Sequence, residues 1–326
     1  MKVLLTHSIL PEPIDKLKQF YQVDVLTDSI SLDKELLIKK IPEYDALLCL
    51  LSDPIDREVL DAAKNLKIIA NYAVGYNNID IEYAGQKGIV VTNTPDVLTD
   101  ATADLTWALI MAVSRKTYPA EQFTREGKFK GWSPTLFLGK DLVNKTLGII
   151  GAGRIGTAVI KRSVGWDMNI LYVSRSENTL IEHEYYAKRV SLETLMKESD
   201  IISIHCPLTP ETHYLLDKKE LDLMKKDAIL INTSRGPVVN ETYLIHKLKN
   251  KEIYGAGFDV YEKEPIIPEE LMSLDNVVLL PHIGSATTDT RLSMGYLAVD
   301  SIIQWLKDHK IPENTVNKTF LVKEDS

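Results

Sequence analysis

Short apolar runs alternate with amphipathic segments along the whole chain, and this alternation restricts the folds that the chain can adopt. The early runs are KVLLT, VDVL, ALLCLL, KIIA and IVVT, and the later ones are LGIIG, NILYV, IISIH, AILIN, YGAGFDV and VVLLP. Unbroken apolar strands that alternate with helices are typical of parallel sheets covered by helices on both faces. The two series therefore predict an α/β protein with two doubly wound parallel-sheet domains of Rossmann or flavodoxin type.

Two long helical patterns mark where one series gives way to the other. The first is DVLTDATADLTWALIMAVSR, residues 96–115, and the second covers residues 288–307. Residues 126–146, EGKFKGWSPTLFLGKDLVNKT, have no clear periodicity and predict a loop or arm. If both long helices join the domains, the chain ends in the domain where it began. We expect one discontinuous domain of residues 1–98 plus 289–326 and a second of residues 99–288.

Composition narrows the class of protein. The length of 326 residues suits two domains, and the net charge of −8 without basic blocks argues against nucleic-acid or membrane-surface partners. Two cysteines, Cys49 and Cys206, are too few for a disulfide framework or a zinc site. The start, MKVLLTHSIL, lacks the apolar run of a signal peptide. We therefore expect a cytoplasmic protein without a bound metal.

A glycine motif follows the first apolar run of the second series. In LGIIGAGRIGTAVI, Gly151, Gly153 and Gly156 form G-x-G-x-x-G between a strand pattern and an amphipathic helix. The first glycine allows a tight turn, the second allows close approach of a pyrophosphate, and the third allows the helix to pack on the strand. The free N–H groups of the helix would bind the phosphates. The alternative is a strand–helix turn without a ligand, but this context favours a dinucleotide site in residues 99–288.

The next strand pattern, NILYV, ends in Ser174, Arg175 and Ser176. A site specific for NAD normally has an acidic residue here, which accepts a hydrogen bond from the ribose 2′-hydroxyl. Serine and arginine would instead bind a 2′-phosphate. Arg175 pointing to water is the alternative interpretation. We predict NADP(H) as the preferred cofactor and keep NAD(H) as possible.

Three polar side chains follow three consecutive strand patterns. Arg235 comes after AILIN, Glu264 lies just past YGAGFDV, and His282 follows VVLLP directly. Strand ends of an open α/β sheet are where ligands bind. A histidine alone would more often be a structural residue where a core strand emerges. Together the three offer a proton donor, its carboxylate partner and an anion anchor, which hydride transfer to a carbonyl requires.

These motifs resemble the D-isomer-specific 2-hydroxyacid dehydrogenase family along essentially the whole chain. The glycine motif, TSRG, D-V-x-x-x-E-P and P-H-x-G-S-A occur in the order of that family, with 29 residues from Arg235 to Glu264 and 18 from Glu264 to His282. The segments LLSDPID, VGYNNID, PDVLTDATAD and the Ser-Arg strand ending are similar to the glyoxylate/hydroxypyruvate reductases within it.

The resemblance implies roles for the three polar residues. His282 would protonate the keto oxygen of a small 2-keto acid during reduction to a D-2-hydroxy acid. Glu264 would bind the other ring nitrogen and favour the imidazolium form. Arg235 would bind the substrate's carboxylate or carbonyl and orient it. Residues 1–98 plus 289–326 would then form the substrate-binding domain.

Further positions follow from the resemblance with weaker support from the residues themselves. The remaining cofactor positions are Thr102, Arg154, Ile155, Cys206, Pro207, Thr212, Thr233, Ser234, Asp259 and Gly284, with Arg235 and His282 beside the nicotinamide. The remaining substrate positions are Leu51, Ser52, Val74, Gly75 and Trp132. Cys206 could instead be a small apolar residue at a strand end. In a homodimer, which is the expected assembly, Trp132 would reach the neighbour's site or be an ordinary interface aromatic.

Other functions remain open at the level of sequence. The substrate could be 3-phosphoglycerate or a bulkier 2-keto acid, although LLSDPID and YAVGYNN contain no basic residue and only Arg57 directly follows the first of them. A dinucleotide-sensing corepressor is an alternative of another class. A methyltransferase with a glycine-rich loop is a third, but it leaves the Arg, Glu and His series unexplained.

Overall fold

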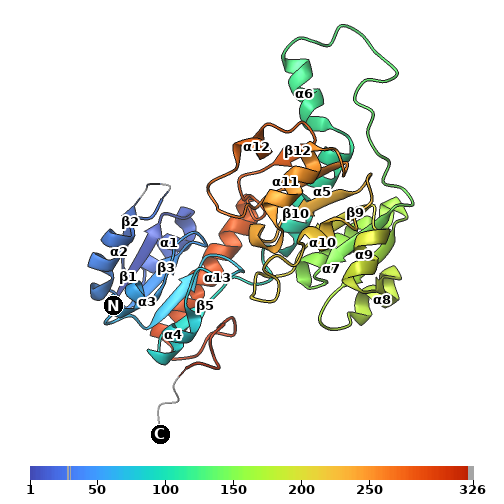
Figure 1. Ribbon diagram of the computed structural model, residues 1–326. Coiled ribbons are helices and arrows are strands. Elements are labelled where there is room, and N and C mark those ends of the chain that lie inside the picture. Colours follow the sequence, from blue (N-terminus) through green and yellow to red (C-terminus); the bar gives the residue numbers. More distant parts are fainter. Residues whose placement is uncertain (28, 30, 322–326) are drawn as a thin grey trace. The chain divides into compact units, whose positions relative to one another are not determined.

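The computed structural model describes residues 1–27, 29 and 31–321, which divide into two compact units (Figure 1). Unit 1 comprises residues 1–98 together with those from 285 onward, and unit 2 comprises Thr99–Gly284. The second boundary expected from sequence, between residues 288 and 289, falls within the first turn of helix α13.

Unit 1 is built around a five-stranded parallel sheet. Its elements are β1 (Lys2–His7), α1 (Pro11–Lys18), β2 (Gln22–Thr27), α2 (Lys34–Lys40), η1 (Ile41–Glu43), β3 (Ala46–Cys49), α3 (Arg57–Ala62), β4 (Ile68–Asn71), α4 (Ile81–Gln86), β5 (Val90–Thr92) and α13 (Thr288–Leu306). The strand order is β2-β1-β3-β4-β5, the flavodoxin-like order. The order reverses between β1 and β3, so the carboxyl ends of these two strands form the point where such sheets bind ligands.

Both faces of the first sheet are buried. Alternate residues of each strand point to opposite sides, and helices cover each side. Leu4, Leu47 and Ile69 pack in one core with residues of α2, α3 and α4. On the other side α13 contacts β3, β4 and α1. This burial on two faces explains why the strands read as continuous apolar runs.

Unit 2 is built around a seven-stranded parallel sheet. Its elements are α5 (Thr99–Ser114), α6 (Thr117–Arg125), β6 (Thr146–Ile150), α7 (Arg154–Arg162), η2 (Ser163–Trp166), β7 (Asn169–Val173), α8 (Thr179–Tyr185), β8 (Lys188–Arg189), α9 (Leu192–Glu198), β9 (Ile201–Ile204), α10 (Lys218–Leu221), β10 (Ile229–Asn232), η3 (Gly236–Val238), α11 (Glu241–Lys249), β11 (Gly255–Phe258), α12 (Glu269–Met272) and β12 (Val277–Leu279). The order β12-β11-β10-β9-β6-β7-β8 is a Rossmann order that reverses between β6 and β9.

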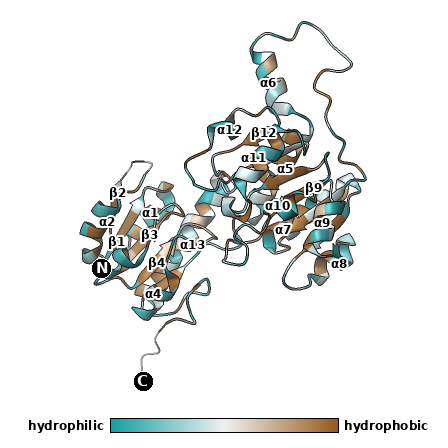
Figure 2. Cartoon of the chain, in the orientation of Figure 1, coloured by the Kyte–Doolittle hydropathy of each residue, from teal (hydrophilic) through white to brown (hydrophobic). Residues whose placement is uncertain are grey.

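Two cores sandwich the second sheet. In β10, Ile229 and Ile231 pack into one core with α5 and α7, whereas Leu230 packs into the other with residues of α9 and α11. Figure 2 shows the result as brown strands inside helices that are partly teal on the outside. The sheet therefore holds its strand ends in fixed register, which is what a site at those ends requires.

The predicted fold class is confirmed. Every apolar run of the two series forms a strand, and both sheets are entirely parallel. Strand β8 was not predicted, because Lys188 and Arg189 are exposed and charged and the strand has two residues. Residues 126–145, all of them described, form neither helix nor strand. Across the described ranges, no helix combines the length and the hydropathy needed to cross a bilayer.

Candidate active site

A histidine–carboxylate pair lies past the ends of β11 and β12. His282 Nδ1 donates a hydrogen bond to Glu264 Oε2 over 2.7 Å. The two side chains are 24% and 31% exposed, so the pair is shielded but still open to a ligand. Because Nδ1 is engaged, Nε2 is the nitrogen left for proton exchange with a reactant.

Neighbouring groups hold the carboxylate in its ionised form. Burial by itself would raise the pKa of Glu264, but His282, the Tyr261 amide and the charge of Arg235 together lower it below its usual value. Tyr261 N donates to Glu264 Oε1 over 3.0 Å, so both oxygens are bound. The ionised carboxylate therefore holds the His282 ring in one orientation.

Asp259 fixes the backbone on the other side of His282. This residue, 1% exposed, follows β11, and its two carboxylate oxygens accept hydrogen bonds from Ile283 N and Gly284 N, both 2.7 Å long. Burial raises the pKa of Asp259 against these hydrogen bonds and the charge of His282. His282 itself has a left-handed backbone, with φ of 56°. The ring direction of His282 is thus set by contacts on both sides.

Arg235 lies directly past β10, the neighbour of β11 in the sheet. Its guanidinium Nη1 donates to Ser234 O over 2.7 Å, and Asn232 Nδ2 donates to Arg235 O over 3.0 Å. Burial lowers the pKa of Arg235, while Glu264 acts in the opposite direction. Arginine stays protonated in proteins, so the site holds a permanent, partly desolvated positive charge.

The strand order brings the three polar residues together, as the sequence predicted. β10, β11 and β12 are adjacent and parallel, so Arg235, Glu264 and His282 all lie at one edge of the second sheet. Chemically, the arrangement can bind an anion, exchange a proton and hold the proton carrier in one orientation.

The glycine motif has the geometry of a phosphate-binding turn. Gly151 has φ of 98°, and a Cβ there would come within 2.5 Å of Cys206 N. A Cβ on Gly156 would collide with Gly151 O, so helix α7 packs directly on the turn. At Gly153, the N-cap of α7, a Cβ would meet no protein atom within 4 Å. The open space at a helix N-terminus fits a pyrophosphate.

The loop after β7 contains the predicted Ser174, Arg175 and Ser176, of which Arg175 and Ser176 are exposed. Arg189 braces this loop: its Nη2 donates to Ser174 O over 3.0 Å and to Arg175 O over 2.9 Å. Arg189 Nη1 also lies 3.8 Å from Glu177 Oε1, so Glu177, the acidic residue that follows Ser176, is paired with a cation.

Several predicted cofactor positions cluster around α5 and the end of β10. Thr106 Oγ1 lies 3.0 Å from Thr233 Oγ1 and donates to Thr102 O over 2.8 Å. A Cβ on Gly284 would lie 3.5 Å from Thr102 Oγ1, so these positions adjoin. Ser234 Oγ donates to Cys206 O, which links the ends of β9 and β10.

The remaining predicted residues of unit 2 lie after β9, at the start of α7 or on the irregular arm. Thr212 Oγ1 donates to Pro207 O over 2.6 Å, just after β9. Arg154 and Ile155 are the first residues of α7. Trp132 lies on the irregular arm and is 85% exposed. Burial raises the pKa of the Cys206 thiol to about 11, which makes it a poor nucleophile.

In unit 1, the predicted substrate residues form two loops at neighbouring strand ends. Leu51 and Ser52 follow β3, and Val74 and Gly75 follow β4. Buried side chains form hydrogen bonds to the backbone of each loop. Asn71 Nδ2 donates to Gly75 O over 2.8 Å, Asn93 Nδ2 donates to Val74 O over 2.8 Å, and Asp53 binds Leu50 N over 2.7 Å.

Comparisons with known proteins decide the family. Residues 107–284 match the family model described as "D-isomer specific 2-hydroxyacid dehydrogenase, NAD binding domain", which is more than half of the chain. The glyoxylate reductase of Thermococcus litoralis is 51% identical over 324 residues, covering 98% of each chain. The chain belongs to the D-isomer-specific 2-hydroxyacid dehydrogenase family. Within the family it falls in the glyoxylate reductase branch.

Solved structures share the fold of this family member. The TT0316 protein of Thermus thermophilus is 42% identical, with a TM-score of 0.91 and coverage of 97% of this chain and 100% of that one. The NADPH-dependent glyoxylate/hydroxypyruvate reductase of Sinorhizobium meliloti, in complex with NADP and malonate, is 30% identical, with a TM-score of 0.86 and coverage of 100% and 99%.

As a member of a dehydrogenase family, the chain is an oxidoreductase that uses a nicotinamide dinucleotide. Its second sheet fits that cofactor, since the glycine turn offers free space at the N-terminus of α7. In the described part of the chain, no group of three or more His, Cys, Asp and Glu side chains is placed to hold a metal ion.

Sequence reasoning missed three residues that support this dehydrogenase site. Asn178 Nδ2 donates to Ala152 O and to Thr157 Oγ1, both over 2.9 Å, and thereby ties the loop after β7 to the glycine turn. His205, hydrogen-bonded to Ser203 Oγ over 2.8 Å, lies at the switch point, and burial lowers its pKa to about 3. Arg189 is the third. Of the three, His205 alone carried a usable signal, because it directly follows strand β9 at the end of the apolar run IISIH.

Proposed function

We propose that this protein reduces small 2-keto acids, such as glyoxylate and hydroxypyruvate, to D-2-hydroxy acids, and that it prefers NADPH. The observation that carries the proposal is the series of Arg235, Glu264 and His282 at three adjacent strand ends, with His282 bonded to Glu264 over 2.7 Å. The names of the relatives support the substrate class, because proteins about half identical over their full length are glyoxylate reductases.

The proposed proton donor is His282. Glu264 accepts its Nδ1 hydrogen, which fixes the ring and leaves Nε2–H to protonate the keto oxygen. The glutamate's negative charge stabilises the imidazolium before transfer, and the neutral imidazole remains hydrogen-bonded afterwards. In the oxidative direction the same nitrogen accepts the proton from the hydroxyl group.

The proposed substrate anchors are Arg235 and the two loops of unit 1. A guanidinium binds a carboxylate or carbonyl with several donors in one plane, which fixes the orientation of the keto carbon. Backbone amides near Val74 and Gly75 add neutral donors for the carboxylate, with Leu51 and Ser52 beside them. The nicotinamide, when bound, supplies the hydride.

Replacing Glu264 by glutamine tests the histidine–carboxylate pair directly. Glu264, whose pKa is lowered, is ionised in the neutral range and accepts a hydrogen bond from His282 Nδ1 over 2.7 Å. Glutamine removes the charge while keeping the shape. We expect kcat/KM for glyoxylate to fall by about tenfold or more, because a hydrogen bond to a charged group is lost. Steady-state rates with glyoxylate measure the loss, and an unchanged kcat/KM would contradict the pairing.

The free energy of unfolding of the same variant should also depend on pH, because the carboxyl of Glu264 is removed. A carboxyl whose pKa is lower in the folded state stabilises the protein above its unfolded-state pKa. That contribution disappears as the pH falls through the lower, folded-state pKa. Wild type and Glu264→Gln should therefore differ in free energy of unfolding at pH 7 and converge in acid.

The cofactor preference rests on the loop after β7. We expect wild type to have a higher kcat/KM with NADPH than with NADH. Arg175→Gln should lower kcat/KM for NADPH by about tenfold or more, because a charge-assisted contact to phosphate is lost, and should leave NADH nearly unchanged. Arg125→Gln, a change at another exposed arginine, serves as the matched control. Equal losses with both cofactors would show that Arg175 does not bind the 2′-phosphate.

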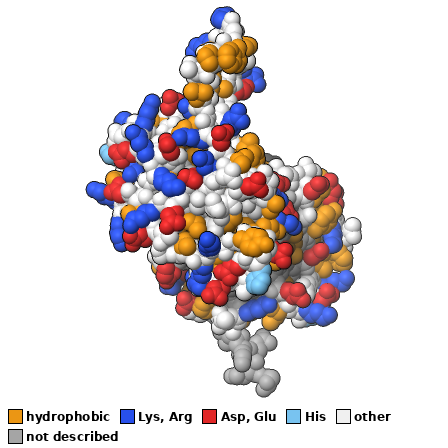
Figure 3. Space-filling model, turned by 90° about the vertical axis from the view of Figure 1, so that its right-hand side faces the viewer, with side chains coloured by type: hydrophobic (Ala, Val, Ile, Leu, Met, Phe, Trp, Pro, Cys, Tyr) orange, Lys and Arg blue, Asp and Glu red, His pale blue; other side chains and the backbone are white. Residues whose placement is uncertain are grey.

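We propose that the chain forms a homodimer through the irregular arm. Figure 3 shows hydrophobic side chains gathered on the segment at the top, which holds α6 and the arm. Phe129, Trp132 and Leu138, all on the arm, are 58%, 85% and 62% exposed, and a gathered apolar patch of this kind is typical of a protein–protein interface. Sedimentation should show a dimer. Trp132→Ala should weaken this dimer, whereas Tyr186→Ala, a change at an 84% exposed tyrosine outside the arm, should leave it unchanged. A monomeric wild type would contradict this assembly.

A substrate panel tests the proposed activity against its alternatives. Oxidation of NADPH is followed with glyoxylate, hydroxypyruvate, phosphohydroxypyruvate and phenylpyruvate. The proposal expects the first two to have the highest kcat/KM. A preference for the phosphorylated or the aromatic acid would replace the substrate but keep the reaction. Bound dinucleotide without turnover of any acid would favour a sensor.

We further propose a cytoplasmic location, which the two free, buried cysteines support.

A further inference from the structure

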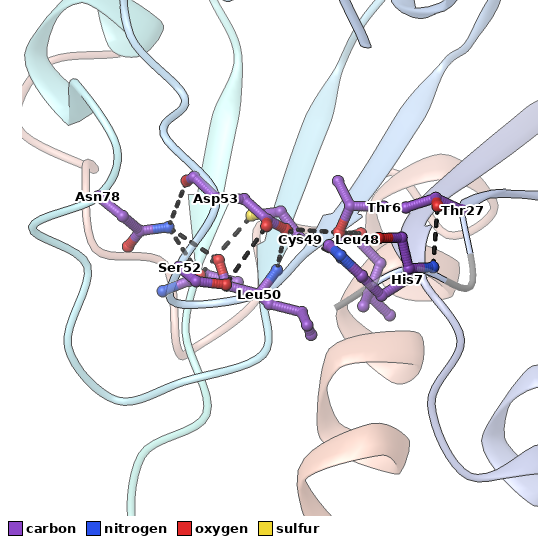
Figure 4. Close-up of polar contacts among 11 residues, drawn as sticks. Thr6, His7, Thr27, Leu48, Cys49, Leu50, Ser52, Asp53 and Asn78 are labelled. Carbon is purple, nitrogen blue, oxygen red and sulfur yellow. Dashed lines mark hydrogen bonds and ion pairs between the residues drawn. The ribbon is translucent and has the colours of Figure 1, made fainter. Parts of the chain in front are cut away.

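A buried polar cluster occupies the switch point of the first sheet. It lies where β1 ends in Thr6 and His7 and where β3 leads into the turn of residues 50–53 (Figure 4). The strand order reverses between these two strands, which is the place where sheets of this type bind ligands. None of the residues placed in the catalytic series belongs to this cluster.

Asp53 is the centre of the cluster. Its side chain is fully buried, and Oδ2 accepts hydrogen bonds from Leu50 N over 2.7 Å and from Thr6 Oγ1 over 2.5 Å. Asp53 N in turn donates to Leu50 O over 3.1 Å, which closes the turn. Leu51 and Ser52 are the two residues enclosed by these contacts. Their backbone position is therefore determined by the Asp53 carboxylate.

His7 faces the same carboxylate oxygen from the end of β1. Its Nδ1 lies 3.7 Å from Asp53 Oδ2, and the residue is 6% exposed. Neither ring nitrogen has a hydrogen-bond partner among the described residues. The buried His7 ring therefore lies beside the turn with its Nδ1 edge toward the Asp53 carboxylate.

Asn78 connects this turn to the second loop of unit 1. Its Nδ2 donates to Leu50 O and to Asp53 O, both over 3.1 Å, and lies 3.4 Å from Asn71 Oδ1. Asn71 in turn holds Gly75 O. One continuous hydrogen-bond network therefore runs from Thr6 through Asp53 and Asn78 to the Val74–Gly75 loop.

We infer that Asp53, held by Thr6 and backed by His7, is a positioning residue that sets the Leu51–Ser52 turn for binding the substrate. The inference rests on the proposed function, in which that turn and the Val74–Gly75 loop contact the 2-keto acid. The Leu51–Ser52 turn, the His7 ring and the Asp53 carboxylate are anchored to the adjacent strands β1 and β3. The cluster holds a substrate-binding turn and contains neither His282 nor Glu264, so it acts on substrate binding rather than on the proton step.

The test compares two variants that alter the cluster in unlike ways. Asp53→Asn removes the charge but keeps the shape, and Thr6→Val removes one donor to Asp53 at nearly constant volume. We expect Asp53→Asn to raise the KM for glyoxylate about tenfold and Thr6→Val about threefold, as weakened hydrogen bonds to a charged group would. The kcat value and the KM for NADPH should stay close to wild type. Binding of oxamate to the enzyme with NADPH should weaken in parallel.

Asn317→Ala is the matched control for general loosening of unit 1. Asn317 is fully buried, accepts from Val91 N over 2.9 Å and donates to Ile89 O over 2.8 Å, away from the turn. The inference expects this variant to lose stability without a change in the KM for glyoxylate. An equal rise of KM in Asn317→Ala would overturn it, because any destabilisation would then suffice.

The remaining outcomes separate this inference from the proposed function. If wild type reduces glyoxylate but both cluster variants keep its KM, the positioning role is wrong and the proposed function stands. If Asp53→Asn does not fold, Thr6→Val decides by the same criterion. If wild type reduces no 2-keto acid, the proposed function fails and the inference fails with it.

Discussion

Replacing His282 by alanine should lower kcat/KM for glyoxylate reduction by about 10³-fold, the usual contribution of a positioned general acid. The variant loses the ring that Glu264 holds at 2.7 Å and with it the nitrogen proposed to protonate the keto oxygen. Binding of NADPH should remain close to wild type, because the glycine turn is untouched. Steady-state rates, together with quenching of protein fluorescence by NADPH, measure both properties.

His246→Ala provides the matched control for the loss of an imidazole. His246 lies on α11, stacks against Tyr243 and is hydrogen-bonded to Asn250. This variant should keep its activity. If His282→Ala kept activity as well as His246→Ala does, a different group would have to donate the proton.

Replacing Arg235 by lysine should lower kcat/KM for glyoxylate by about 10²-fold, the cost of a misplaced substrate. Lysine keeps the positive charge but lacks the planar set of donors that binds a carboxylate in one orientation. The loss should include a rise in KM for glyoxylate and a fall in kcat, because both binding and alignment suffer. The KM for NADPH should change much less.

Arg162→Lys is the control for the same substitution outside the site. Arg162 is bound to Asp104 over 2.6 Å and to Asp100 over 2.9 Å, on the surface of unit 2. Lysine there should leave kcat/KM near wild type. Similar kinetics for Arg235→Lys and Arg162→Lys would mean that Arg235 does not orient the substrate.

The predictable parts of this protein are those encoded by short-range pattern. A strand buried on both faces must be apolar throughout, so runs such as AILIN and VVLLP identify it without any tertiary information. A residue shortly after such a strand lies at the sheet edge, and Arg235 and His282 lie there, each a few residues past its strand. Fold and family followed from these runs and from the motifs that end them.

The supporting residues could not be predicted in the same way, because their partners are distant in sequence. Thr6 meets Asp53 across 47 positions, and Asn178 reaches Ala152 across 26. Arg189 braces the loop at Ser174 from a strand of two exposed residues that no apolar pattern marks. Such contacts depend on strand order and register, which a single sequence does not contain.

The most direct test of the central claim is the conversion of hydroxypyruvate by purified wild-type protein with NADPH, followed by chiral separation of the product. The account predicts D-glycerate in an amount equal to the NADPH consumed. L-glycerate, or consumption of NADPH without glycerate, would contradict it.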